Sequence, residues 1–135
     1  MTAKEFLQQA YYAQQEIDMK LEEITRLQSL ATRTTSTIKS TPSGSKSASS
    51  KVENAVVKIQ EKIERLGEEV GELSEIIETV SDAISKVQNP AEKKILKYRY
   101  LCFFSWKQIA LRMKASLRYV FKIHKDALKN FPAVQ

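Results

Sequence analysis

Cationic side chains recur throughout the last third of the sequence, where they could bind a polyanion. Residues 91–135 contain 11 Lys and Arg against two acids, Glu92 and Asp126, and so carry a net charge of +9. Residues 1–90 contain 11 Lys and Arg against 14 acids and carry −3. A segment this short and this basic typically meets nucleic acid, and the alternative is a solvated basic surface that balances an acidic neighbour. The candidate functional residues therefore lie in residues 91–135.

The side chains of this segment divide into two groups by the DNA contacts that their chemistry allows. Arg and Lys can donate to guanine edges, Leu can contact a thymine methyl, and Tyr can stack or use its hydroxyl. The side chains expected to contact bases are Leu117, Arg118, Tyr119 and Lys122. Phosphate contacts add affinity without sequence information, and they are expected at Lys107, Lys114, Ser116, Lys125 and Lys129. The two sets together predict double-stranded DNA as the partner.

Residues that could support catalysis or bind a metal are scarce. His124 is the single histidine and Cys102 the single cysteine, and these two cannot form a zinc site. No Ser/His/Asp or Cys/His set and no glycine-rich phosphate loop can be assembled. We expect Trp106 and Cys102 to be core residues and His124 to be half-buried in a helix rather than bound to phosphate. The sequence therefore predicts neither an enzyme nor a protein with a cofactor or metal.

Three short helices are expected to position the basic side chains. Their expected bounds are 91–102, 106–113 and 117–130, with Ser105 and Ser116 as caps and a turn at Lys114-Ala115. The side chains of the last two helices that should point inward are Trp106, Ile109, Ala110, Met113, Val120, Ile123, Ala127 and Leu128. This is the layout of a helix-turn-helix DNA-binding domain, here residues 90–131, whose last helix enters the major groove.

A long helix is expected to precede this domain, over residues 52–88. Its apolar positions alternate at spacings of four and three, the a/d seam of a coiled coil, and they are Val52, Val56, Ile59, Ile63, Leu66, Val70, Leu73, Ile77, Val80, Ile84 and Val87. The nine residues from Val56 to Ile84 in that set are the expected oligomerisation contacts, in a homodimer or a higher homo-oligomer. Gly67 and Gly71 mark either a close helix crossing or a weak point in the helix.

The first half of the chain is expected to hold a second helix and a linker. Within residues 1–31 an amphipathic helix is predicted at 4–31 from an apolar stripe and the side chains that widen it, namely Phe6, Leu7, Ala10, Tyr11, Ile17, Leu21, Ile24, Leu27, Leu30 and Ala31. Residues 32–51 contain twelve Ser or Thr together with Pro42 and Gly44. That composition buries little apolar surface and predicts a flexible linker.

The sequence as a whole predicts an all-α protein, with long coiled-coil helices followed by the three-helix domain. It contains three Gly and three Pro, and no run shows the strict alternation of a strand. No apolar run approaches the ~18 residues of a membrane span, so we expect no membrane partner and a cytoplasmic location.

The pattern of the last third resembles region four of bacterial sigma factors, and the phage variants of that domain in ArpU-like and RinA-like late-gene regulators. The residues that carry the resemblance are Tyr98–Leu101, Ser105–Ala110, Ser116, Val120, Ile123, His124, Ala127 and Leu128. The N-terminal Ala3–Leu7 and Gln9–Tyr11, the Ser/Thr segment and Pro42 resemble an uncharacterised phage family of Gram-positive hosts that ends in the same domain. Where the pattern usually has Gly in the turn, this chain departs from it with Lys114, for which a left-handed conformation is tolerable but unfavourable.

This resemblance implies promoter DNA binding, with host RNA polymerase as a second candidate partner, in the cytoplasm of a bacterial host. No part of the chain resembles the other sigma regions, so a complete sigma factor is not expected. The leading interpretation is a phage or prophage transcription regulator. Two alternatives stay open: a phage small terminase subunit that packages DNA, and a protein–protein interaction module such as an anti-repressor or an RNA polymerase-binding protein. Oligomer size separates the first two, and DNA binding separates both from the third.

Overall fold

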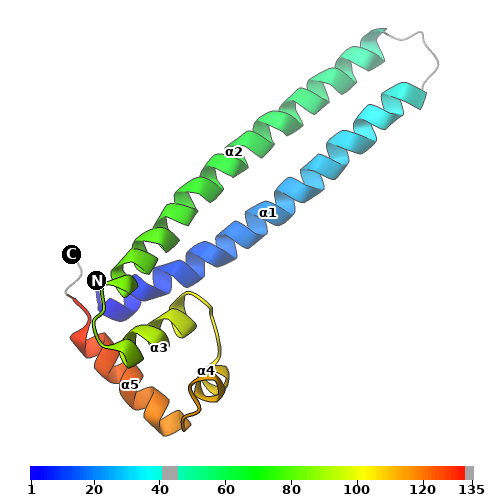
Figure 1. Ribbon diagram of the computed structural model, residues 1–135. Helices are drawn as coiled ribbons and strands as arrows, with labels where there is room; N and C mark the ends of the chain where they lie inside the picture. Colours follow the sequence, from blue (N-terminus) through cyan, green and yellow to red (C-terminus); the bar gives the residue numbers. More distant parts are fainter. Residues whose placement is uncertain (41–45, 133–135) are drawn as a thin grey trace. The chain divides into compact units, whose positions relative to one another are not determined.

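The computed structural model describes residues 1–40 and 46–132, and in these residues it contains five helices and no strand (Figure 1). The helices are α1 (Ala3–Ser40), α2 (Lys46–Ser85), α3 (Pro90–Tyr100), α4 (Trp106–Met113) and α5 (Leu117–Asn130). The predicted all-α class is confirmed for this part of the chain. The chain divides into two compact units, one that combines Met1–Gln15 with the chain from Leu73 onward, and one that spans Glu16–Glu72.

The unit that spans Glu16–Glu72 is a pair of antiparallel helical segments from α1 and α2 (Figure 1). Lys20 Nζ lies 2.8 Å from Glu69 Oε2, and Lys62 Nζ lies 3.3 Å from Glu23 Oε1, so the numbering rises on one helix as it falls on the other. Ion pairs on an exposed surface contribute at most ~1 kcal/mol each. The apolar side chains buried between polar faces therefore hold the pair together, and they are Ile17, Ala31 and Leu66.

Both long helices reach further into the Ser/Thr-rich segment than its composition predicted. α1 ends at Ser40 and α2 begins at Lys46, and the rest of the predicted linker, residues 41–45, lies outside the described residues. In the extended part of α1 the hydroxyls donate to carbonyls four residues back: Thr34 Oγ1 to the Leu30 oxygen at 2.7 Å and Ser36 Oγ to the Thr32 oxygen at 3.0 Å. A hydroxyl bonded in this way no longer competes for the helix backbone elsewhere.

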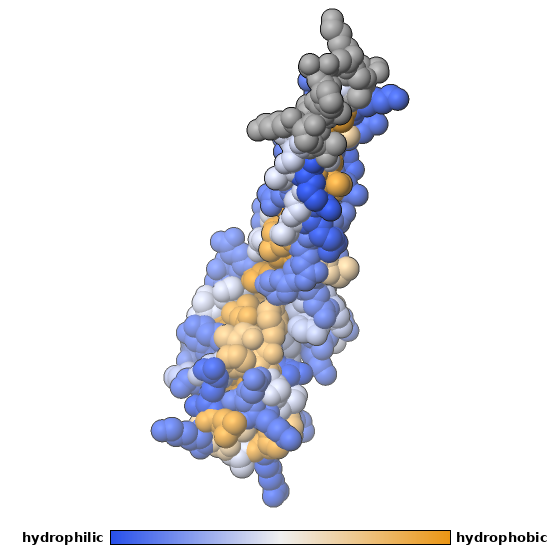
Figure 2. Space-filling model, turned by 90° about the vertical axis from the view of Figure 1, so that its right-hand side faces the viewer, coloured by the Kyte–Doolittle hydropathy of each residue, from blue (hydrophilic) through white to orange (hydrophobic). Residues whose placement is uncertain are grey.

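The buried row of α1 is narrower than the predicted stripe. Leu7, Ala10 and Ile17 are buried as expected, and Ala13 completes the row at 3% exposure. Three other members of the predicted stripe are exposed, at 43% for Tyr11, 47% for Leu21 and 41% for Leu30. Tyr11 and Leu30 are rotated away from the buried row, since successive residues differ by about 100°. Leu21, fourteen residues after Leu7, points in nearly the same direction as the buried row and is exposed all the same. On the face shown in Figure 2, hydrophobic atoms accordingly gather in patches between hydrophilic side chains.

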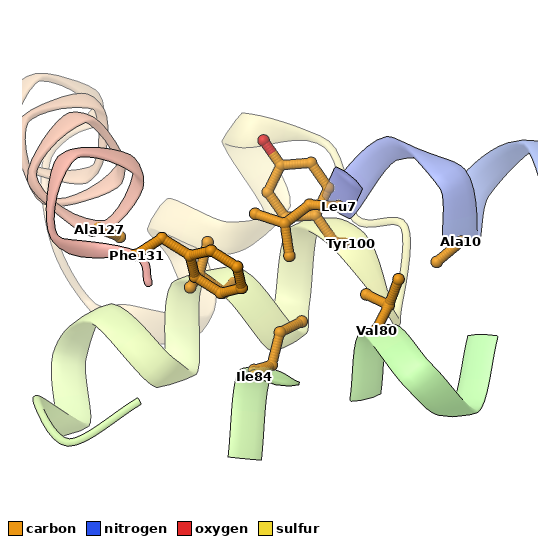
Figure 3. Close-up of a cluster of buried hydrophobic side chains, with 8 residues drawn as sticks. Leu7, Ala10, Val80, Ile84, Tyr100, Ala127 and Phe131 are labelled. Carbon is orange, nitrogen blue, oxygen red and sulfur yellow. The ribbon is translucent and has the colours of Figure 1, made fainter. Parts of the chain in front are cut away.

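The first unit has a core to which α1, α2, α3 and α5 all contribute (Figure 3). Its buried members are Leu7, Ala10, Val80, Ile84, Leu96, Tyr100, Ala127 and Phe131. The rings of Phe6 and Phe131 lie 6.0 Å apart beside it. Val80 and Ile84, the last two residues of the predicted oligomerisation seam, are fully buried by side chains of their own chain. A second copy therefore cannot contact them without opening this core.

Most of the remaining seam is half-buried. The structure also bears on the two interpretations of the glycines in α2. Gly67 and Gly71 have nothing within 4 Å of the position where a Cβ would stand. They therefore do not mark a close crossing of another helix of the same chain, which favours the interpretation of a locally weak helix. α2 ends at Ser85, before the predicted Gln88, and Asn89 caps α3 by accepting from the amides of Ala91 and Glu92 at 3.0 and 3.1 Å.

Candidate functional site

Two serine caps fix where α4 and α5 begin, as the sequence predicted. Ser105 Oγ accepts from the Gln108 amide at 3.2 Å, and Gln108 Oε1 accepts from the Ser105 amide at 2.9 Å, a complete capping box. Ser116 Oγ accepts from the Tyr119 amide at 3.1 Å. Replacing such a cap typically costs about 1 kcal/mol, so these two hydroxyls stabilise the first turns of the helices that carry the predicted DNA contacts.

The turn between α4 and α5, expected at Lys114-Ala115, contains a lysine in the left-handed conformation. Lys114 has φ 52° and ψ 46°. The Ala115 amide donates to the Ala110 carbonyl at 3.0 Å, and the Lys114 amide donates to the Leu111 carbonyl at 3.2 Å. This pair of bonds is a Schellman motif, in which glycine normally occupies the place of Lys114. A side chain with a Cβ there costs about 1 kcal/mol, which the surrounding packing must offset.

A small apolar core beneath the turn holds α3, α4 and α5 together. Ile95, Ile109 and Val120 have no exposed surface, and Ala110 is 8% exposed at the place where two helices approach closely. The partly buried side chains around them are Tyr98, Phe104, Trp106, Met113, Ala115 and Ile123. Every residue predicted to point inward from α4 and α5 is buried or half-buried, with Ala127 and Leu128 packed in the core that Figure 3 shows.

The four side chains predicted to contact bases all lie exposed on the first turns of α5. Leu117 is 39% exposed and Tyr119 46%, and Arg118 and Lys122 belong to the exposed class as well. Arg118 and Lys122 are four residues apart and so share one face of the helix, whereas Val120 is buried. The start of α5 therefore presents its hydrogen-bond donors outward while its apolar residue anchors it.

The predicted phosphate contacts are also exposed, but only some of them lie together. Lys107 of α4, Lys114 and Ser116 line one shallow recess of about 660 Å³ with Leu117 and Leu111. Lys125 and Lys129 lie further along α5 and do not line it. Ser116 already bonds the Tyr119 and Val120 amides through its side chain and carbonyl. The earlier first-turn amides of α5 are the ones that can serve an outside acceptor.

The surface of this segment is more basic than its composition suggests. Of its two acids, Glu92 is 7% exposed and accepts from Asn130 Nδ2 at 2.9 Å, so its charge is directed inward. Asp126 is half-buried. The basic side chains of α4 and α5 therefore face solvent with little acidic competition, which is the electrostatic footprint of a surface that binds polyanions.

His124 is half-buried, as predicted, and lies in an aromatic cluster. Its Nε2 is 2.8 Å from the hydroxyl of Tyr100, and its ring lies edge-on to Trp106 at 4.6 Å between centroids. Burial lowers the pKa of His124 to about 4, and the charges of Arg99 and Lys4 lower it further in the same direction. Burial also raises the pKa of Tyr100. The imidazole is therefore neutral at pH 7 and is not a cationic phosphate contact.

Three residues differ from the expectation drawn from the sequence. Cys102, predicted to be a core residue, is exposed, because α3 ends at Tyr100 and the chain turns outward with the Cys102 amide bonded to the Lys97 carbonyl at 2.9 Å. Leu111 and Phe121 were not singled out, yet they are 78% and 47% exposed. Phe121 follows Leu117 by four residues and so shares its face, a spacing that could have revealed it.

The described residues contain neither a candidate metal site nor a helix suited to span a membrane. Among residues 1–40 and 46–132, no three His, Cys, Asp or Glu side chains come together as a metal site. Within the same part of the chain no helix combines the length and the apolar character needed to cross a bilayer. Comparison with known proteins adds no identity: no family model matches the sequence, and neither curated proteins nor solved structures give a match.

Proposed function

We propose that this protein binds double-stranded DNA through a helix-turn-helix formed by α4 and α5, with α5 in the major groove. One observation carries the proposal: a capped helix exposes Arg118, Tyr119 and Lys122 together, on a segment with a net charge of +9. The major groove is ~12 Å wide, admits one α-helix and is read by the first residues of that helix.

In this proposal the two groups of side chains have different tasks. Arg118 and Lys122 donate to base edges, and Leu117 and Tyr119 add apolar or stacking contacts. Lys107, Lys114, Ser116, Lys125 and Lys129 hold phosphates. The recess that brings Lys107 and Lys114 next to the start of α5 supports this arrangement, since cations on both sides of the reading helix can reach the backbone that flanks the groove.

We infer further that the protein is a phage or prophage transcription regulator with a sigma region-four-like domain, acting at promoters. The support is the sequence pattern between Tyr98 and Leu128, together with the left-handed Lys114 at the turn position where that pattern has glycine. A second candidate function, contact with host RNA polymerase, is favoured by Leu111, which exposes 78% of its surface beside Lys107. Leu111 lines the same recess as the exposed Leu117, and contiguous exposed apolar side chains of this kind mark protein contacts.

The test is affinity against salt concentration for a duplex selected from a random pool and for a scrambled duplex. Arg118→Ala should weaken the selected duplex by about 1–3 kcal/mol and relax its preference at one base pair. Lys125→Ala should weaken both duplexes alike and reduce the salt slope by about one. Lys58→Ala, an exposed lysine of α2, is the matched control. The proposal fails if wild-type protein binds no duplex at low salt, and contact with polymerase through Leu111 then takes first place.

We also propose that the protein is a homodimer. Four apolar side chains in the Glu16–Glu72 unit expose more than a third of their surface, namely Met19, Leu21, Leu30 and Val57. Met19 and Leu30 are eleven residues apart and share one face of α1, which a second copy would cover as it pairs with the α1–α2 hairpin. Sedimentation equilibrium should give twice the mass of the chain, and Met19→Asp with Leu30→Asp should give the monomer with unchanged helicity. A ring of eight or more subunits would instead favour DNA packaging.

A further inference from the structure

A second recess, of about 560 Å³, lies where the first turns of α1 meet α3, α4 and α5 in the first unit. None of its residues belongs to the proposed DNA-reading face. Its volume is within the ~300–1,000 Å³ typical of sites for small ligands. The lining residues that matter here are Lys4, Tyr11, Tyr12, Arg99, Phe103 and Trp106.

One wall of this recess consists of aromatic rings with accessible faces. Tyr12 is 60% exposed and Tyr11 43%, although both are large and partly apolar. Tyr11 packs edge-on against Tyr12 at 5.7 Å and against Phe103 at 5.6 Å. Phe103 has φ 59°, a left-handed conformation that costs an aromatic residue about 1–2 kcal/mol. Strain of this kind persists where the surrounding structure enforces it, and it concentrates at ligand sites.

The recess is also lined by an indole that lies beside a fixed cation. Arg99 Cζ lies 4.4 Å from the centre of the Trp106 ring, and Arg99 Nη1 donates to the Phe104 carbonyl at 3.1 Å. The guanidinium is therefore held in place before any ligand arrives. It leaves further donors, because an arginine carries five N–H groups and this carbonyl uses one of them.

The recess is positively charged. It is lined by Lys4 and Arg99, and none of the described residues around it is Asp or Glu. His124 also lines the recess, and its pKa shows the effect of this positive charge. Burial lowers that pKa most, and the charges of Arg99 and then Lys4 lower it further. An anionic group in the recess would therefore gain from two cations that no acid in the lining neutralises.

We propose that this recess binds a nucleotide unit, with the base stacked on the exposed Tyr12 ring and the phosphate held by Lys4 and Arg99, beside Trp106. Aromatic platforms beside cations are the features that recognise unpaired nucleotides, because every base has a flat face and every nucleotide a negative charge. The unit is either a free nucleotide or an unpaired nucleotide of a single strand. The site shares no residue with the duplex-binding face of α5 and stands independently of it.

The chain contains two natural reporters for this test, since Trp106 and His124 are its single tryptophan and single histidine. AMP should quench the Trp106 fluorescence of the full chain, with an apparent Kd of about 1 mM or below. It should also raise the pKa of His124, followed by NMR, toward the ordinary value of histidine. Tyr12→Ala should weaken AMP at least about fivefold, the smallest effect expected for one stacked base. Lys4→Gln should weaken AMP but not adenosine. Tyr119→Ala on α5 is the matched control and should leave AMP binding unchanged.

The oligonucleotide (dA)6 distinguishes the two sources. If it binds more than tenfold more tightly than AMP, the site holds unpaired nucleotides of a strand; if it binds no more tightly, the site holds free nucleotides. The proposal is overturned if AMP changes neither reporter at about 10 mM. It is also overturned if Tyr12→Ala and Lys4→Gln bind AMP like wild type, or if inorganic phosphate alone raises the His124 pKa as much as AMP does. Loss of duplex binding by Tyr119→Ala or Arg118→Ala bears only on α5.

Discussion

Acidification should destabilise the first unit through a single imidazole. The folded chain binds a proton at His124 only near pH 4, because burial, Arg99 and Lys4 lower its pKa to about 4 from the model-peptide value of 6.5. Between these two pH values the unfolded chain carries more protons than the folded chain. The free energy of unfolding must therefore fall as the pH falls from 6.5 toward 4, and must level off on either side of this window as far as His124 is concerned.

The size of the effect follows from the two pKa values and the exposure of the ring. A full difference between them would correspond to about 3 kcal/mol, at about 1.4 kcal/mol for each pH unit. Because the ring of His124 is only half-buried, water and salt screen part of this difference, and we expect a loss of about 1–2 kcal/mol. Once protonated, His124 can only donate in its 2.8 Å hydrogen bond with Tyr100, whose hydroxyl then accepts.

Urea unfolding between pH 4.5 and 7.5 measures this loss. Carboxylates titrate in the lower part of the same range, so the informative quantity is the difference between wild type and His124→Gln, which keeps a polar side chain but does not titrate. Wild type should lose about 1–2 kcal/mol more than the variant over this range. If the two stability profiles run parallel, the imidazole is not held neutral by its surroundings and the account of this cluster is wrong.

Three further predictions concern backbone conformation and packing, and all are measured by urea unfolding at pH 7. Lys114→Gly should stabilise the chain by about 1 kcal/mol by relieving the left-handed lysine, and the gain should be absent in Lys114→Ala, which keeps the Cβ. Gly67→Ala and Gly71→Ala should each stabilise by about 1 kcal/mol, because the new methyl group meets no atom; a loss would show that these glycines have a packing role. Ile84→Ala should cost about 2–5 kcal/mol, against a few tenths for an exposed residue, and a smaller cost would mean that the core in Figure 3 is not closed.

Local signals in the sequence predicted the local geometry of the α4–α5 region. The caps at Ser105 and Ser116 depend on a hydroxyl within three residues of the amide it accepts from. The inward residues follow from a period of 3.6. None of these features requires knowledge of a distant part of the chain, and all of them are confirmed.

The same signals could not say what covers an apolar face. The heptad pattern placed Val80 and Ile84 on the seam of a coiled coil, but it could not show that Leu7 and Phe131, both far away in the sequence, would bury them. Cys102 shows the opposite error. It was predicted to be buried because it follows apolar residues in the sequence, but it is exposed after the end of α3. The second recess could not be predicted either. The helices that line it are far apart in the sequence, and no periodic pattern relates them.

The first unit joins two stretches of chain that are separated by residues 16–72, and this separation has a consequence for how the protein folds. Closing a flexible loop of that length costs about 3–4 kcal/mol of chain entropy before any contact between Leu7 and Ile84 can form. The intervening residues contain a helical hairpin with mostly local contacts, and such hairpins form quickly. Once it has formed, its two arms replace the flexible loop, so most of that entropy has already been lost when residues 1–15 meet α2. We therefore expect the Glu16–Glu72 hairpin to act as the folding nucleus, with mutations at Leu66 slowing refolding and mutations at Ile84 mainly speeding unfolding.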